Sequence, residues 1–178
     1  MHLGCTLTSR RVAVASGTGE SASMRLTSFT DYSLRVLIYL AVRENGKATI
    51  AEISESFQVS EHHLVKVVHF LGKAGFLTNS RGRSGGVRLA MAPEDVNIGA
   101  VVRATETDIV PAECFAREGG HCRITTACRL IGVLQEAVDA FFGALDGYTL
   151  ADISGNPKPL ARLLFPAIEG GSARTVPS

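Results

Sequence analysis

The feature that most constrains the fold is a pair of short helical patterns joined by a tight turn. Thr49 and Glu52 form a T-x-x-E capping box ahead of an apolar run, which predicts the start of a short helix. Gln58-Val59 supplies the turn, and Ser60 is placed to cap a longer helix that ends at Gly75. This arrangement predicts a helix-turn-helix, although similar helical hairpins also occur in proteins that do not bind DNA.

The flanking segments extend this pattern to a winged helix. Residues 30–44 and 97–106 place apolar side chains at helical spacing, which predicts a helix on each side of the motif. Residues 76–79 and 87–90 are short strand-like runs around a glycine-rich tip, which predicts a β-hairpin or wing. The fold class expected is therefore mostly α with a small β-hairpin.

A further helix is expected from Thr125 or Thr126, either of which could cap it, to about Leu145. Its broad apolar stripe needs a partner, either its own domain or a second copy across a two-fold axis. We therefore expect a disordered or non-native extension at 1–23, a DNA-binding domain at 24–106, a cysteine-bearing loop at 107–124, a dimerisation helix at 125–150 and a loose, proline-containing tail at 151–178.

The charge is divided unevenly along the chain. The formal net charge of +1 combines two Lys/Arg against one Asp/Glu in residues 1–23, nine against five in residues 24–90 and seven against eleven in residues 91–178. A basic front half favours a polyanionic partner. No run of apolar residues is long enough for a membrane span or a secretory signal, so a cytoplasmic location is the default expectation.

Polar and basic side chains are expected where the second helix and the wing would meet DNA. In a helix-turn-helix the early residues of the second helix reach base edges, and basic side chains at a wing tip contact phosphates or the minor groove. The alternative is a solvated helix face beside a solvated loop. The candidate DNA-binding residues are Ser60, Glu61, His62, His63, Lys66, Arg81 and Arg83.

Three of the four cysteines, Cys114, Cys122 and Cys128, lie within fifteen residues of one another. Their spacing differs from the C-x2-C pairs of zinc fingers, and thiolates are suited to iron–sulfur clusters, zinc or copper(I). Cys128 is expected in the first turn of the long helix, where amide dipoles would stabilise a thiolate.

Three alternatives stay open at this point: a cluster, a zinc site completed by His121, or thiols without metal. An enzyme with Cys122 as nucleophile and His121 as base is disfavoured, because adjacent side chains rarely point at each other.

Four segments carry a resemblance to a known family. They are residues 24–35 (MRLTSFTDYSLR), 63–69 (HLVKVVH), 81–89 (RGRSGGVRL) and 145–152 (LDGYTLAD), and the three clustered cysteines lie between the last two. Together they resemble the NsrR family of nitric-oxide-sensitive repressors, which belongs with IscR to a superfamily of winged-helix regulators. The resemblance covers about residues 24–153 in order, and the family normally begins where Met24 stands.

The resemblance implies a homodimeric repressor of a palindromic DNA operator. It implies a [4Fe–4S] cluster held by Cys114, Cys122 and Cys128, with Asp31 of the partner subunit as fourth ligand, and release of the operator when nitric oxide attacks the cluster. Position alone would mark Asp31 only as an acidic residue in a first helical turn. The alternatives are an IscR-like [2Fe–2S] regulator of redox state or cluster supply, and a zinc-stabilised interaction module.

Overall fold

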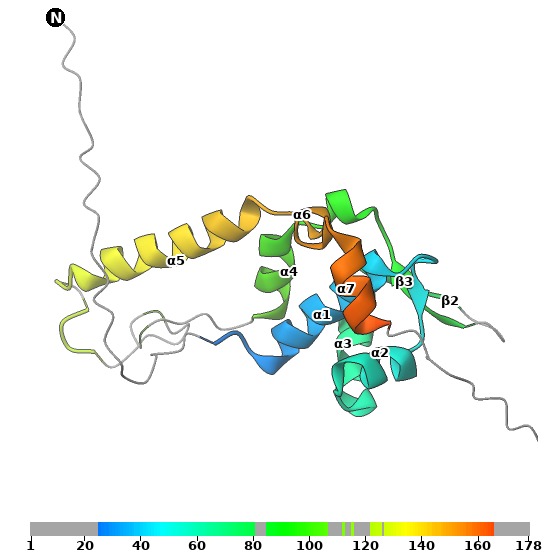
Figure 1. Ribbon diagram of the computed structural model, residues 1–178. Helices are drawn as coiled ribbons and strands as arrows, with labels where there is room; N and C mark the ends of the chain where they lie inside the picture. Colours follow the sequence, from blue (N-terminus) through cyan, green and yellow to red (C-terminus); the bar gives the residue numbers. More distant parts are fainter. Residues whose placement is uncertain are drawn as a thin grey trace, which may run out of the picture.

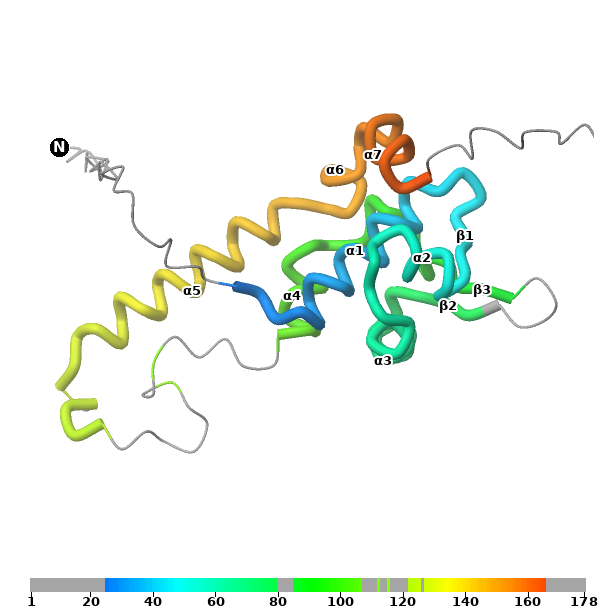
Figure 2. The backbone as a smooth tube through the Cα atoms, turned by 60° about the horizontal axis from the view of Figure 1, so that its bottom comes forward, coloured from blue at the N-terminus to red at the C-terminus, as the bar shows by residue number. Residues whose placement is uncertain are grey.

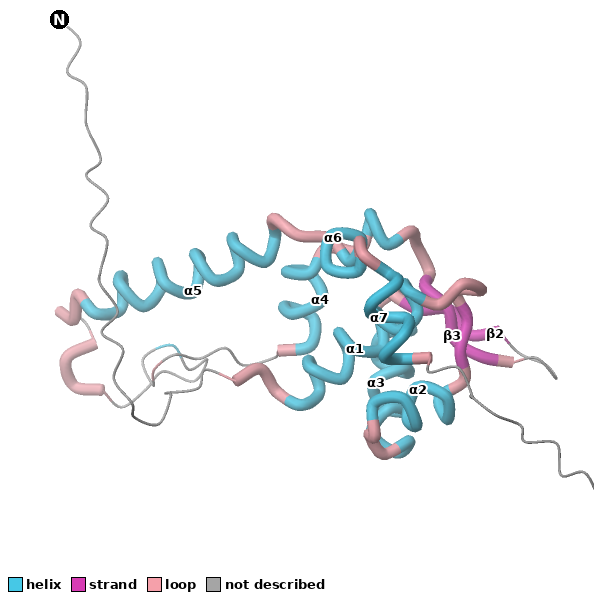
Figure 3. The backbone as a smooth tube through the Cα atoms, in the orientation of Figure 1, coloured by secondary structure: helices cyan, strands magenta, loops and turns pink. Residues whose placement is uncertain are grey.

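One long helix projects from a head built of the remaining elements (Figure 1). The computed structural model describes residues 25–80, 85–106, 112, 115, 122–125 and 127–165. In chain order the elements are α1 (Ser28–Val42), β1 (Lys47–Ala48), α2 (Ile50–Phe57), α3 (Glu61–Lys73), β2 (Leu77–Ser80), β3 (Gly86–Leu89), the 3-10 turn η1 (Pro93–Asp95), α4 (Ile98–Thr105), α5 (Leu130–Asp146), α6 (Leu150–Ser154) and α7 (Pro157–Leu164). The sheet lies at the end of the head opposite α5 (Figure 3).

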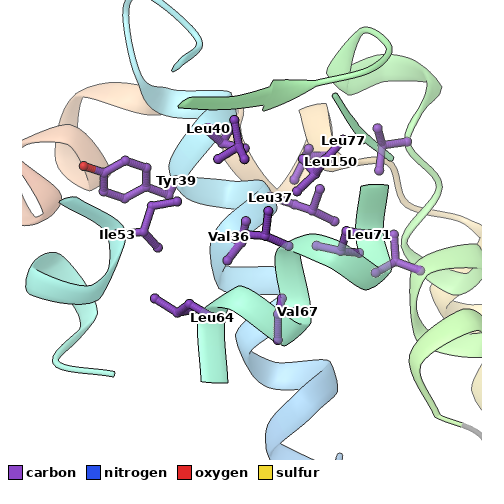
Figure 4. Close-up of a cluster of buried hydrophobic side chains, with 14 of the residues drawn as sticks. Val36, Leu37, Tyr39, Leu40, Ile53, Leu64, Val67, Leu71, Leu77 and Leu150 are labelled. Carbon is purple, nitrogen blue, oxygen red and sulfur yellow. The ribbon is translucent and has the colours of Figure 1, made fainter. Parts of the chain in front are cut away.

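The core of the head forms around α1. Its buried side chains come from α1, α2, α3, α4, α6 and all three strands, together with Val59 and Val96, and Figure 4 shows part of this cluster. Full burial of a Val or Leu side chain contributes about 1.5–3 kcal/mol to stability, so this cluster is the main apolar contribution. The labelled members are Val36, Leu37, Tyr39, Leu40, Ile53, Leu64, Val67, Leu71, Leu77 and Leu150.

The expected helix-turn-helix is present as α2 and α3. The capping box is complete, with Thr49 Oγ1 accepting from the Glu52 amide and the Glu52 carboxylate accepting from the Thr49 amide. Gln58 ends α2 with a left-handed φ of 53°, and the Ser54 hydroxyl donates to Val59 O at 2.6 Å across the turn. Ser60 occupies the N-cap of α3 as expected, but its side chain makes no capping hydrogen bond.

Glu52 also links α2 to the end of α1. Hydrogen bonds from the Thr49 backbone amide, the Thr49 hydroxyl and Arg43 lower the pKa of the Glu52 carboxyl, against an opposing effect of burial. A lowered pKa in the folded state means that this stabilisation is present at neutral pH and is lost as the pH falls through the folded value.

We therefore expect Glu52→Gln to lower Tm at pH 7. The difference in Tm between this variant and the parent chain should shrink as the pH falls below the ordinary glutamate pKa of about 4.3. Thermal melts between pH 7 and pH 3 measure the difference. Glu55→Gln, on the exposed side of the same helix, is the control and should change Tm less at pH 7. A constant difference between the Glu52→Gln and parent melts across the range would contradict the assignment.

The wing is a hairpin with one strand more than expected. β2 and β3 pair antiparallel from Leu77 opposite Leu89 to Ser80 opposite Gly86, as the sequence predicts. The additional strand β1 pairs with β3, which gives the order β1-β3-β2. A two-residue strand has no alternation that the sequence could reveal. Arg81 and Arg83, the basic residues of the tip, lie outside the described residues.

The long helix begins later than expected. It starts at Leu130 with Arg129 as N-cap, so Cys128 precedes the helix and does not lie in its first turn. The reason is local: the Thr125 hydroxyl donates to Cys122 O at 2.8 Å and closes a separate turn, so Thr125 does not cap the helix. Thr126 lies outside the described residues.

The tail after residue 151, expected to be loose, contains α6 and α7. A second capping box, between Thr149 and Asp152, starts α6 and sets the buried Leu150 into the core. Pro157 stands at the first position of α7, where a proline favours a helix because its missing amide hydrogen is not needed. Phe165, which follows the last residue of α7, packs edge-on against the Tyr39 ring of α1 with the ring centroids 4.9 Å apart, and this contact holds the end of α7 against α1.

Candidate nucleic-acid interface and cysteine site

The helix α3, the second helix of the helix-turn-helix and the expected recognition helix, is amphipathic. The side chains that it buries determine which of its residues face solvent. Leu64, Val67, Val68 and Leu71 are at most 4% exposed and pack into the core. The opposite side presents the candidate DNA-binding residues, since Ser60, Glu61, His62, His63 and Lys66 are all exposed. The structure thus places these five at the exposed surface of the helix-turn-helix.

The two adjacent histidines differ in their surroundings. The His63 ring stacks on the Tyr32 ring of α1, with the ring centroids 6.2 Å apart and the planes inclined by 26°. The Arg35 guanidinium lies 5.9 Å from the centroid of the same Tyr32 ring. His62 is tilted 55° from His63 at 6.1 Å. His63 is therefore oriented by α1, while His62 faces outward from the recognition helix.

Sequence reasoning missed two exposed residues on the same helix. Val65 and His69 follow His62 at intervals of three and seven residues, which is the spacing of one helical face. Extending the face from His62 and Lys66 by one turn would have found both.

Two of the three clustered cysteines can be placed. Cys122 is exposed and Cys128 is half-buried, and both are free thiols. Figure 2 shows the 122–125 turn beside the free end of α5, far from α3 and the sheet. Within the described ranges, no three His, Cys, Asp or Glu side chains lie close enough together to hold a metal ion. Cys114 and His121 fall outside these ranges.

The placed thiols fit an iron–sulfur ligand set in their chemistry. Both are reduced, six residues apart and reachable from solvent, and thiolate sulfur is the usual protein ligand of such clusters. The described cysteines thus allow a cluster site at the tip of α5.

Asp31 lies in the first turn of α1, as expected. Its side chain is 45% exposed and is held by Arg35 one turn later, with Arg35 Nη2 at 2.7 Å and Nε at 3.1 Å from its carboxylate oxygens. An exposed i,i+4 pair of this kind contributes only about 0.3–0.5 kcal/mol. Within one chain, Asp31 is thus an oriented surface carboxylate that remains open to a further ligand.

The C-terminal end of α5 packs closely against α4. Arg103 donates to both carboxylate oxygens of Asp146, at 2.6 and 2.5 Å, and its guanidinium lies 4.5 Å from the Phe142 ring. These hydrogen bonds from Arg103 lower the pKa of the Asp146 carboxyl. Gly99 permits the approach, because a methyl group there would overlap Asp146 Oδ1 and lie 3.1 Å from its backbone nitrogen.

Among the helices that the structure describes, none combines the length and the apolar character that a membrane span requires.

The chain is similar to known regulators along most of its length. Residues 26–156 match the Rrf2 family, described as "Iron-dependent Transcriptional regulator". The chain is 49% identical over 142 residues to the HTH-type transcriptional regulator NsrR of Geobacillus kaustophilus, covering 79% of this chain and 97% of that protein. It is 47% identical to the Bacillus subtilis protein of the same name, with the same coverages.

Solved structures show the same fold. CymR, the global cysteine regulator of B. subtilis, is 26% identical with a TM-score of 0.57, covering 75% of this chain and 98% of CymR. IscR of T. potens is 22% identical with a TM-score of 0.61, covering 77% of this chain and 90% of IscR. The winged helix expected from the sequence is confirmed. The chain is therefore a DNA-binding transcriptional regulator, not an enzyme, and it belongs to the Rrf2 family of iron-dependent transcriptional regulators.

Proposed function

We propose that this regulator is a cytoplasmic homodimeric repressor that binds a palindromic operator and releases it in response to nitric oxide. The sensing group is a [4Fe–4S] cluster held by Cys114, Cys122 and Cys128 of one subunit and Asp31 of the partner subunit. The observation that carries the proposal is the similarity, at up to 49% identity, to proteins named NsrR, together with free thiols at the tip of a projecting helix.

The exposed apolar face of α5 supports a dimer. No residue of α5 is buried within one chain, and Leu130 and Val133 are 56% and 60% exposed. At about 1.5 Å per residue the helix is about 25 Å long, enough for an extended contact with a second copy. Leu134 and Val138 continue this apolar face along the helix, whereas Phe141, Phe142 and Leu145 at its other end pack partly against the core of the head.

The position of the thiols supports a link between subunits. Cys128 stands two residues before the first residue of α5, and Figure 2 shows that this end of α5 and the 122–125 turn lie far from their own head. When two α5 helices pack about a two-fold axis, each tip approaches the head of the other chain, where Asp31 stands at the start of α1. A ligand from that helix would join the tip of one chain to the DNA-binding head of the other.

The joined heads would hold their recognition helices at a fixed separation. Dimeric helix-turn-helix proteins read half-sites about one helical turn of DNA apart, roughly 34 Å. When bound, the cluster would supply iron that reacts with nitric oxide. Asp31 would be the hard oxygen ligand among soft thiolates and therefore the weakest attachment of the cluster. A carboxylate of Asp31 that is not held by iron would keep its ion pair with Arg35, and the two heads would then not be tied.

The test is made on the full chain purified without oxygen. We expect a brown protein with about four iron and four sulfide per monomer, which shifts a fragment of its own promoter region in a gel and releases it when a nitric oxide donor is added. About two of each would favour the [2Fe–2S] alternative. Colourless protein with stoichiometric zinc, or promoter binding that nitric oxide leaves unchanged, would overturn the proposal.

A further inference from the structure

Val65 is an apolar residue in the middle of the polar face of the recognition helix. It is 50% exposed, whereas Leu64 and Val67 beside it are 1% exposed. His62 and His69 share its outward face, at intervals of three and four residues, and Lys66 is exposed next to it. A single exposed valine needs no explanation on an ordinary surface. On the surface proposed to read DNA, however, an exposed valine can contact an apolar group of a base.

A groove adjoins Val65 between the recognition helix and the wing. Its volume is about 430 Å³, and its apolar walls come from Ile50 at the start of α2, Val65 and Val68 on α3, and Val87 on β3. His69 and Asn79 add polar atoms to the lining. Val65 therefore continues an apolar surface from the groove to the outer face of α3.

The charge beside this surface favours DNA as the occupant. Lys66 is exposed on α3, one residue after Val65. A cation next to an apolar strip suits a phosphate-bordered groove, and the one apolar group that base edges present in the major groove is the C5-methyl of thymine. We propose that Val65 reads a thymine methyl in each operator half-site. The inference rests on the proposed operator binding and names a base that it would recognise.

The test removes either methyl partner. Duplexes are selected from a randomised pool with the anaerobically purified full chain, and each thymine of the selected site is then replaced singly by deoxyuridine, which lacks only the methyl. At the contacted thymine the replacement should weaken binding about fourfold, the factor expected for one buried methyl group. With Val65→Ala the same replacement should have no effect, and the variant should bind the thymine and uracil duplexes equally.

The control is Leu163→Ala, which trims a 79% exposed side chain on α7 and should leave the thymine-to-uracil effect intact. Because Val65 is half exposed, Val65→Ala should melt like the parent chain, and Val65→Thr, of the same shape, provides a second variant that should retain part of the effect. The inference is overturned if no thymine shows the effect, or if Val65→Ala shows it undiminished. Failure of the parent chain to select any DNA would instead overturn the proposed function.

Discussion

Cys128→Ser should lose its iron and bind the operator between about fivefold and 150-fold more weakly than the parent chain, the range typical of coupling between two sites. A serine hydroxyl is a poor substitute for a thiolate on iron, and Cys128 lies two residues before α5, where it would tie the loop to the helix. Iron content and anaerobic fluorescence anisotropy with a labelled operator duplex measure the two losses on one preparation.

The chain provides a matched control for this change. Cys5 is the cysteine outside the cluster of three, so Cys5→Ser should leave both iron content and operator affinity unchanged. Asp31→Ala is the informative companion: it should keep the dimer while weakening the dependence of DNA affinity on nitric oxide. Parent-like iron and operator binding in Cys128→Ser would remove this residue from the site, and unchanged nitric oxide sensitivity in Asp31→Ala would remove Asp31.

Gly99→Ala should separate α5 from the head. The added methyl would meet the side chain and backbone of Asp146, so the Arg103–Asp146 contact would have to open. Overpacking of this kind costs about 1–3 kcal/mol, and each kcal/mol lowers Tm by roughly 2–4 °C in a chain of this length. Operator affinity should fall as well, because the angle between head and projecting helix is no longer fixed. Thermal melts and anisotropy titrations measure the two effects.

Gly72→Ala makes the same chemical change where there is room. A methyl at Gly72, in α3, would meet only Leu77 O at 3.9 Å, and alanine is favoured over glycine within a helix by about 0.5–1 kcal/mol. The two substitutions should therefore shift Tm in opposite directions. If Gly99→Ala also raised Tm, the close approach of α4 and α5 would not be what this glycine serves.

Local signals predicted the head well where each element carries its own boundary residues. The Thr49–Glu52 box and the left-handed Gln58 mark the ends of α2 within a few residues of sequence. Features that depend on distant parts of the chain could not be predicted in this way. No residue near Gly99 in the sequence indicates that Asp146 will lie against it. A proline is equally compatible with a loose tail and with the first turn of a helix, so Pro157 alone could not indicate that α7 begins there.

The candidate site likewise combines features that local sequence predicts with features that depend on another part of the assembly. The three cysteines are visible as a group because they are close in sequence, and the outward face of α3 follows from helical periodicity. The role proposed for Asp31 comes only from the family resemblance, since its own neighbourhood shows an exposed first-turn carboxylate paired with Arg35. A ligand supplied by another chain leaves no trace in local spacing.

The segment between α4 and α6 leaves and re-enters the head at the two ends of one short helix, α4. The chain leaves the head after Thr105 and re-enters it at Tyr148, where the Ile98 amide donates to Tyr148 O and the Leu150 amide to Val96 O. Only the length of α4, about 12 Å, separates the two points. A domain whose connections lie this close tolerates exchange of what lies between them. One winged head could therefore accept sensing segments of different length and chemistry without rebuilding its core.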